Sequence, residues 1–151
     1  MDVAAEVFAT MLDAYLILGL IPENAADTQT ADGRPATLDH AHARLARMRC
    51  AEATEIPRVD VEALARRAME TQAAFVCKAV ARVLDGRPTP RRVVLAGSGE
   101  AIARRVLATH ARLSSIPVIS LAERLGPALS EAACAYAVAT LVAEQRRTPI
   151  P

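Results

Sequence analysis

Apolar residues recur along most of this chain with the spacing of helices. In the first twenty positions they return every three or four residues and stop at Gly19, with Pro22 just beyond. This pattern predicts a helix over Asp2–Leu20. Comparable patterns predict further helices over Leu38–Cys50 and Val61–Leu84, one that starts at Glu100, and one that starts at Ser130 and ends near Glu144.

Two short apolar runs interrupt the helical spacing and predict strands. They cover Val93–Leu95 and Pro117–Leu121. Both are continuous rather than alternating, which is typical of strands buried on both faces of a parallel sheet. A two-stranded sheet leaves both outer edges open. Either further strands come from another chain, or helices cover the edges in an unusual way.

The predicted fold class is therefore α/β and predominantly helical, with about two parallel strands and five helices. The length of 151 residues suits a single domain spanning residues 1–151. Within it we expect a polar loop at 23–36, a helical insertion at 37–85 and a βαβα core at 91–145.

The stretch RRVVLAGSGEAIARRVL, residues 91–107, predicts a strand, a Gly97-Ser98-Gly99 turn and a helix from Glu100. Backbone amides in such a turn and at a helix N-terminus bind anionic ligands. A glycine turn is also an ordinary way to join a strand to a helix in any α/β domain. Both interpretations stay open from the residues alone.

Composition and charge exclude several classes of function. Hydrophobic residues make up 52% and charged residues 23%, and the formal net charge is +1. The arginine pairs are dispersed beside acidic residues, so no nucleic-acid surface is predicted. No apolar run is long enough to span a membrane, and the acidic N-terminus is unlike a signal peptide. Three separated cysteines without a CxxC pair predict buried thiols in a reducing cytoplasm.

Asp13 and the pair His40 and His42 are ionisable residues on predicted helices. Asp13 stands between Leu12 and Tyr15, where a charge is unfavourable unless it is paired or faces a cleft. A surface-facing Asp13 is the favoured prediction. His40 and His42 are two positions apart on a predicted helix, so they cannot share a metal, and we expect both to be solvated.

The segment TADGRP within the polar loop carries a second set of candidates. It places Thr30, Asp32, Gly33 and Arg34 around an Asp-Gly turn that ends at a proline. In one interpretation Asp32 accepts hydrogen bonds from its own backbone and the segment is only a turn. In the other, the same side chains face a ligand.

Four segments together resemble the hydantoinase/oxoprolinase-like family of tetrahydromethanopterin-linked C1-transfer pathway proteins. The segments are FATMLDAYLILGLIPENAADTQTADGRPAT, HARLARMRC, VVLAGSGEAIARRVL and VISLAERLGPALSEAACAYAVATL. The resemblance covers nearly the whole chain and is most specific in FAT–DAY, TADGRPAT and a segment similar to SGSGE, in which Ala96 replaces the first serine.

The resemblance implies a fold and a reaction. Family members belong to the acetate kinase/sugar kinase/Hsp70/actin superfamily, with two ribonuclease-H-like lobes around a nucleotide- or phosphate-binding cleft. Archaeal relatives join an aminomethylfuran diphosphate to a γ-glutamyltyramine phenol in methanofuran biosynthesis and release diphosphate. Bacterial relatives would build the analogue used in formaldehyde oxidation. The expected activity is thus of transferase type, although the family name suggests a hydrolase.

This chain departs from the family pattern at its N-terminal side. By this resemblance, members usually run to more than twice this length and carry a phosphate loop of the Asp-x-Gly-Gly kind, which is absent here. The chain looks like the C-terminal lobe alone. We therefore expect it to be inactive by itself and to need an N-terminal lobe as partner.

The implied chemistry gives each candidate residue a role. Neutralising a leaving diphosphate needs Mg²⁺ or cationic and backbone donors. The expected ligand-binding groups are Thr30, Gly33, Arg34, Gly97, Ser98, Gly99 and Glu100. Asp32 is the expected metal-side carboxylate, and Asp13 either holds the loop or acts as a base toward the phenol. The expected ligands are a nucleotide or diphosphate, with Mg²⁺, and a small phosphorylated substrate.

A second hypothesis needs no catalysis. The chain would be a helical module derived from the family, and copies of it would self-associate through the open strand edges and the alanine-rich last helix. A stable homodimer without affinity for the ligand would favour this hypothesis. A gene neighbour that encodes the missing lobe would favour the first.

Overall fold

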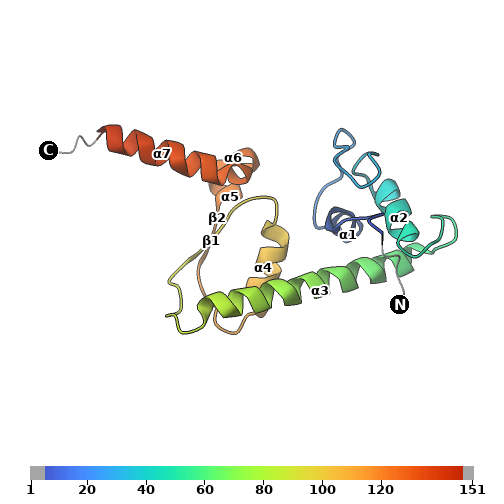
Figure 1. Cartoon of the computed structure of the whole chain (residues 1–151), viewed down its shortest axis with the longest axis horizontal. Coiled ribbons are helices and arrows are strands. Elements are labelled where there is room, and N and C mark those ends of the chain that lie inside the picture. Colours follow the sequence, from blue (N-terminus) through green and yellow to red (C-terminus); the bar gives the residue numbers. More distant parts are fainter. Residues whose placement is uncertain (1–5, 148–151) are drawn as a thin grey trace. The chain divides into compact units, whose positions relative to one another are not determined.

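The computed structural model describes residues 6–147, and these fall into two compact units that divide between Phe75 and Val76 (Figure 1). Each unit has its own group of buried apolar side chains. The two units are described separately below. Whether they act as the single predicted domain stays a prediction.

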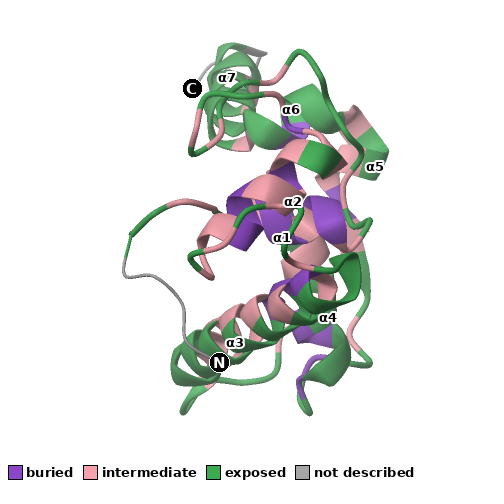
Figure 2. Ribbon diagram, turned by 90° about the vertical axis from the view of Figure 1, so that its right-hand side faces the viewer, coloured by how far each residue is buried: buried purple, intermediate pink, exposed green. Residues whose placement is uncertain are grey.

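The first unit contains helix α1 (Met11–Ile17), helix α2 (Leu38–Arg47) and the first part of helix α3 (Arg58–Leu84). Apolar residues from all three helices, together with Ala36 of the intervening loop, form its core. The buried members are Ala14, Leu16, Ile17, Ala36, Ala41, Leu45, Val61 and Ala65. Figure 2 shows this burial on α1 and α2 in purple.

Helix α1 is shorter than the predicted Asp2–Leu20. It begins at Met11 because the Asp13 carboxylate accepts a hydrogen bond from the Thr10 N–H at 2.8 Å, a capping contact at the first turn. Residues 6–10 are not helical, and residues 2–5 of the prediction lie outside the described part. The helix ends before Gly19, whose φ of +66° fits the glycine stop expected from the sequence.

The polar loop between α1 and α2 is closed on itself by backbone hydrogen bonds. Asn24 donates to the Ala36 carbonyl at 2.9 Å, and Ala36 donates to the Asp27 carbonyl at 2.8 Å. The Leu38 N–H at the start of α2 donates to the Glu23 carboxylate at 2.7 Å. The loop that carries the TADGR segment is therefore anchored at both ends.

Helix α2 ends three residues before its predicted end at Cys50, and α3 begins three residues before its predicted start at Val61. Cys50 itself has a φ of +57° and leaves the helical conformation. Pro57 immediately precedes α3 and suits a helix start, because proline lacks the N–H that would remain unbonded there.

The second unit contains strand β1 (Val93–Leu95), helix α4 (Glu100–Thr109) and strand β2 (Val118–Ser120). The strands are parallel, with Val93 opposite Val118 and Leu95 opposite Ser120. Leu95, Leu107 and Leu113 are its buried apolar core, and Val80 and Leu84 of α3 pack against them. The parallel pair and its α4 crossover follow the prediction.

The prediction that both strands are buried on both faces is wrong within the described residues. Val94 is 58% exposed and Val118 is 38% exposed, while Leu95 and Ser120 are buried. By the register, Val94 lies on the face opposite Leu95, Val118 and Ser120, so neither face of the sheet is covered along its whole length. The described part of the chain supplies no further strand to cover its edges.

The chain after β2 forms three helices where the sequence predicted a loop and one helix. They are α5 (Leu121–Leu125), α6 (Pro127–Glu131) and α7 (Ala133–Arg147). The Ser120 hydroxyl accepts the Glu123 N–H at 3.1 Å and starts α5, and Gly126, with a φ of +88°, separates α5 from α6. The described residues therefore hold seven helices rather than five.

Candidate functional site

Asp13 is fully buried in α1 and does not face the surface, so the favoured surface prediction is wrong. One carboxylate oxygen, Oδ2, accepts the Thr10 N–H. The other, Oδ1, accepts the Nε–H of Arg44 at 2.8 Å and lies 2.7 Å from Arg44 Nη2. The alternative stated for this position, a charge that is paired, is the one that holds.

Asp32 forms the turn that the TADGR segment predicted and also a second set of contacts. Its Oδ1 accepts the Arg34 N–H at 3.2 Å and the Thr30 hydroxyl at 3.4 Å. The Thr30 hydroxyl also lies 2.6 Å from the Arg34 carbonyl. The segment is therefore a self-bonded turn in which Gly33 has a φ of +71°, a conformation that favours glycine.

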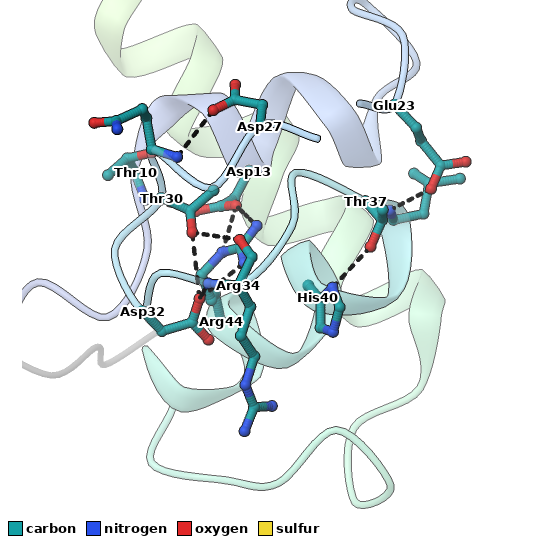
Figure 3. A network of polar contacts seen from close by, with 12 residues as sticks. Thr10, Asp13, Glu23, Asp27, Thr30, Asp32, Arg34, Thr37, His40 and Arg44 are labelled. Atoms are coloured by element: carbon teal, nitrogen blue, oxygen red, sulfur yellow. Dashed lines mark hydrogen bonds and ion pairs between the residues drawn. The ribbon is translucent and has the colours of Figure 1, made fainter. Parts of the chain in front are cut away.

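Arg44 of α2 joins the two carboxylates and was missed by the sequence analysis. Its Nη1 donates to Asp32 Oδ1 at 3.0 Å, while its other donors face Asp13 (Figure 3). Arg44 is fully buried, whereas Arg47, one turn later, is a third exposed and lies 3.4 Å from Asp32 Oδ2. The signal available in the sequence was two arginines on one face of a short helix, without a visible partner.

These contacts determine how the groups ionise. Burial acts to raise the pKa of the Asp32 carboxyl, but the Arg34 N–H and the Arg44 guanidinium together lower it more, so this pKa lies below its usual range. Burial acts to lower the pKa of Arg44, and Asp13 and Asp32 outweigh it, so the pKa of Arg44 lies above its usual value. Both groups remain charged at neutral pH.

The Arg34 side chain leaves the cluster that holds its backbone. Figure 3 shows it extending away from Asp32 and Arg44, and the residue is exposed. Within residues 6–147 its guanidinium makes no hydrogen bond or ion pair. The ion pairs of the cluster join two arginines, Arg44 and Arg47, to two aspartates, Asp13 and Asp32, so the cluster is neutral and the Arg34 guanidinium stands outside it.

The groups around Asp32 do not fit a resident magnesium ion. Both of its oxygens already face guanidinium groups, and Asp13 is bonded to Arg44. Among residues 6–147 no three His, Cys, Asp or Glu side chains gather as a metal site would require. Nothing in the arrangement therefore supports Asp32 as a metal ligand.

The Gly97–Glu100 segment lies in the second unit, at the carboxyl ends of the two parallel strands. The Gly97 N–H donates to the Ser130 hydroxyl at 3.0 Å, so one of the expected ligand amides already has a partner. Within the described residues the N–H groups of Ser98 and Gly99 donate to no other group. Gly99 precedes α4 without a side-chain cap, and a Cβ at this position would meet no atom within 4 Å.

Glu100 points into a polar network rather than into open space. One carboxylate oxygen accepts the Ser120 hydroxyl at 2.8 Å, and the other accepts Arg104 Nε at 2.7 Å. Arg104 also pairs with Glu123. The structure thus gathers Thr30, Asp32, Gly33 and Arg34 with Asp13 in one unit, and Gly97–Glu100 with Ser120 and Ser130 in the other.

The predictions for histidines and cysteines are corrected in part. His40 is half-buried and bonds the Thr37 hydroxyl at 3.0 Å, and His42 bonds the Ile56 carbonyl at 3.1 Å, so neither is simply solvated. Cys50 and Cys134 are exposed and only Cys77 is partly covered, contrary to the buried thiols expected. All three remain free thiols.

Comparison with known proteins identifies the family to which this sequence belongs. A model of the family described as Hydantoinase/oxoprolinase matches residues 4–145, nearly the whole chain. The chain belongs to the hydantoinase/oxoprolinase family. Both clusters lie within the matched residues.

One relative of this hydantoinase/oxoprolinase protein is named for its reaction. It is the (4-{4-[2-(gamma-L-glutamylamino)ethyl]phenoxymethyl}furan-2-yl)methanamine synthase of Methanococcus vannielii, 25% identical over 141 residues. The aligned residues cover 93% of this chain and 63% of the relative. The chain thus spans less than two thirds of that relative. The relative is longer than this chain but less than twice as long, so it is shorter than the length expected for family members.

The structure adds one observation on membranes. None of the helices described between residues 6 and 147 combines the length and apolar character needed to cross a bilayer.

Proposed function

We propose that this chain is the phosphate-binding lobe of a two-lobed condensing enzyme of the hydantoinase/oxoprolinase family. It would bind a diphosphate-bearing furan substrate and act with an N-terminal lobe that carries the facing phosphate loop. The family match and the name of the M. vannielii synthase support this assignment. The proposal also includes a ribonuclease-H-like lobe fold and a cytoplasmic role in methanofuran and tetrahydromethanopterin-linked C1 metabolism.

One observation carries the proposal for ligand binding. The exposed Arg34 guanidinium projects from a loop whose backbone is held by the ion pairs of Asp13, Asp32 and Arg44, and it has no partner of its own among the described residues. A planar guanidinium forms paired hydrogen bonds with phosphate oxygens, and its affinity for phosphate is greater when the side chain is held in place. An exposed arginine on a loop that is anchored by hydrogen bonds is suited to binding an anion.

The second unit would supply backbone donors to the same class of ligand. The N–H groups of Ser98 and Gly99, at the N-terminus of α4, are suited to phosphate oxygens. Glu100 is held by Ser120 and Arg104. Its carboxylate would accept a hydrogen bond from a hydroxyl or ammonium group of a substrate rather than contact phosphate.

The proposed reaction displaces diphosphate from an activated methylene group. The phenol oxygen forms a bond to the methylene carbon, the bond between that carbon and the diphosphate oxygen breaks, and the phenolic proton passes to a base. The exposed Arg34 guanidinium would stabilise the negative charge on the leaving group. The burial of Asp13 and its pairing with Arg44 favour a role in holding the loop over a role as that base.

Mg²⁺ belongs to this proposal only as a companion of the diphosphate. It binds phosphate oxygens and usually keeps several water ligands. No residue of this chain is assigned to it.

The test is a titration of the full chain with inorganic diphosphate, followed by calorimetry and by thermal shift. The unmutated chain should bind and become more stable. Arg34→Ala should weaken binding by about tenfold, through the loss of one charge-assisted hydrogen bond. Gly99→Val should weaken it by about tenfold because its side chain obstructs the approach of the ligand to the backbone amides. Because the Gly99 site is open and its φ is ordinary, the second variant changes ligand access rather than packing.

Arg66→Ala is the matched control, since Arg66 is an exposed arginine of α3 in the same unit. It should leave the affinity for diphosphate unchanged. A chain that shows no affinity for diphosphate or nucleotide, alone or with the N-terminal lobe, would sink the proposal.

A second candidate function rests on a different observation. Helix α7 exposes Val138 by 62% and Leu141 by 59%, and β1 exposes Val94 by 58%. These surfaces suit self-association of a non-catalytic helical module, through helix α7 and the open strand edges. Oligomerisation without any ligand affinity would favour this function over the first.

A further inference from the structure

Arg44 is the largest side chain that the structure buries completely. It extends from α2 and contacts α1 through Asp13 and the polar loop through Asp32. Its Nη2 atom lies close to Asp13 but makes no well-aligned hydrogen bond. One guanidinium thus joins three segments that are otherwise separated along the chain.

The contact of Arg44 with the loop converges on one atom. Asp32 Oδ1 accepts Arg44 Nη1 at 3.0 Å, the Arg34 N–H at 3.2 Å and the Thr30 hydroxyl at 3.4 Å. Any displacement of this oxygen moves the backbone of Arg34 with it. The oxygen that Arg44 holds is therefore also the acceptor of the Arg34 N–H, although the two arginines do not bond each other.

Stability alone is a weak reason for a buried arginine at this place. Removing charges from water is costly, and well-packed apolar residues often replace a buried ion pair without loss of stability. The network does supply fixed geometry, because a guanidinium has several donors in one plane. A role in setting the position of the loop accounts for Arg44 better than a role in stability.

We propose that Arg44 is a positioning residue for anion binding, which acts through Asp32 to hold Arg34 in its binding orientation. The inference rests on the proposed function of this loop. Arg44 itself is buried and would not touch the ligand.

A double-mutant cycle on the affinity for inorganic diphosphate tests this role in the full chain. Arg44→Lys keeps the charge but cannot reach Asp13 and Asp32 together, so it should weaken binding by about tenfold. In the Arg34→Ala background the same change should weaken binding by less than about twofold, because the residue through which it acts is gone. A general loss of stability would reduce both backgrounds equally.

Asp32→Ala separates positioning from simple charge. Removing a carboxylate near an anion should strengthen binding by Coulomb's law. Positioning predicts the opposite, a weaker affinity, since Arg34 loses the acceptor of its N–H. This variant also keeps the test decisive if Arg44→Lys does not fold, as judged by circular dichroism.

Arg66→Lys is the control for an arginine-to-lysine change on an exposed helix surface. Equal effects of Arg44→Lys in both backgrounds, or a tighter affinity of Asp32→Ala, would overturn the positioning role alone. An unmutated chain that does not bind diphosphate would overturn the proposed function together with it.

Discussion

Both partners of the Asp13–Arg44 pair are closed off from water, and this determines what the loss of one partner costs. Asp13→Ala would leave a buried guanidinium without its main counter-charge. Such a change costs about 3–5 kcal/mol of unfolding free energy. Chemical denaturation of the full chain followed by circular dichroism measures the difference.

The exposed Arg58–Glu62 pair of α3 provides the comparison. Glu62→Ala should change the unfolding free energy by no more than about 1 kcal/mol, because solvent screens this pair. Equal losses for the two substitutions would mean that burial does not strengthen the Asp13 contact.

The sequence indicated the two aspartates of this network, Asp13 and Asp32, but not Arg44, which pairs with both. Asp13 was singled out because a charge between apolar neighbours needs a partner, and the Asp32 turn was predicted because its bonds reach only two residues away. Arg44 lies 31 positions from Asp13, and nothing in a single sequence indicates a contact at that separation. The buried charge was therefore foreseeable as a problem, and its solution was not.

Elements with strong local signals were predicted well. The apolar run of β1 and the start of α4 at Glu100 coincide with the structure. Helix α1 was predicted too long because apolar periodicity continues upstream of Thr10, where a capping contact sets the actual start. The start of α5 and its separation from α6 depend on the Ser120 cap and the Gly126 conformation, which the apolar spacing does not indicate.

Ser130 connects α6 to the glycine turn that follows β1. Its buried hydroxyl accepts the Gly97 N–H, so Ser130→Ala removes the partner of a turn amide. We expect a loss of about 1–3 kcal/mol in unfolding free energy. Faster amide exchange at Gly97 should accompany it, measured by NMR.

Ser115→Ala serves as the control, since Ser115 is exposed. It should alter neither the stability nor the Gly97 amide. Unchanged exchange at Gly97 in Ser130→Ala would show that this hydrogen bond does not hold the turn.

At the scale of the whole molecule, the family match covers both units. Each unit nevertheless has its own separate group of buried apolar residues. The number and direction of the strands were predictable because both runs are short, apolar and separated by a helix. The exposure of Val94 was not, because continuous apolar runs indicate burial without saying which chain provides it. The described residues leave that cover missing.

Helix α7 leads to a prediction on association. Its exposed apolar residues should drive self-association of the isolated chain, detected by sedimentation velocity. Val138→Lys with Leu141→Lys should shift the chain toward monomer, because charges replace apolar contact area. Gln145→Lys, on the same helix, adds charge at an exposed polar position and should leave the association unchanged. A monomeric unmutated chain would contradict the self-association hypothesis.

The buried network of Asp13, Asp32 and Arg44 also constrains how this chain can evolve. A mutation that removes one member passes through a protein with an unbalanced charge in its interior, which is strongly destabilising. Asp13 and Arg44 can therefore be replaced only by nearly simultaneous changes, or after other mutations have raised stability. Across the family these positions should change together or not at all. The residue at the exposed position of Arg34 should instead vary with the ligand that each member binds.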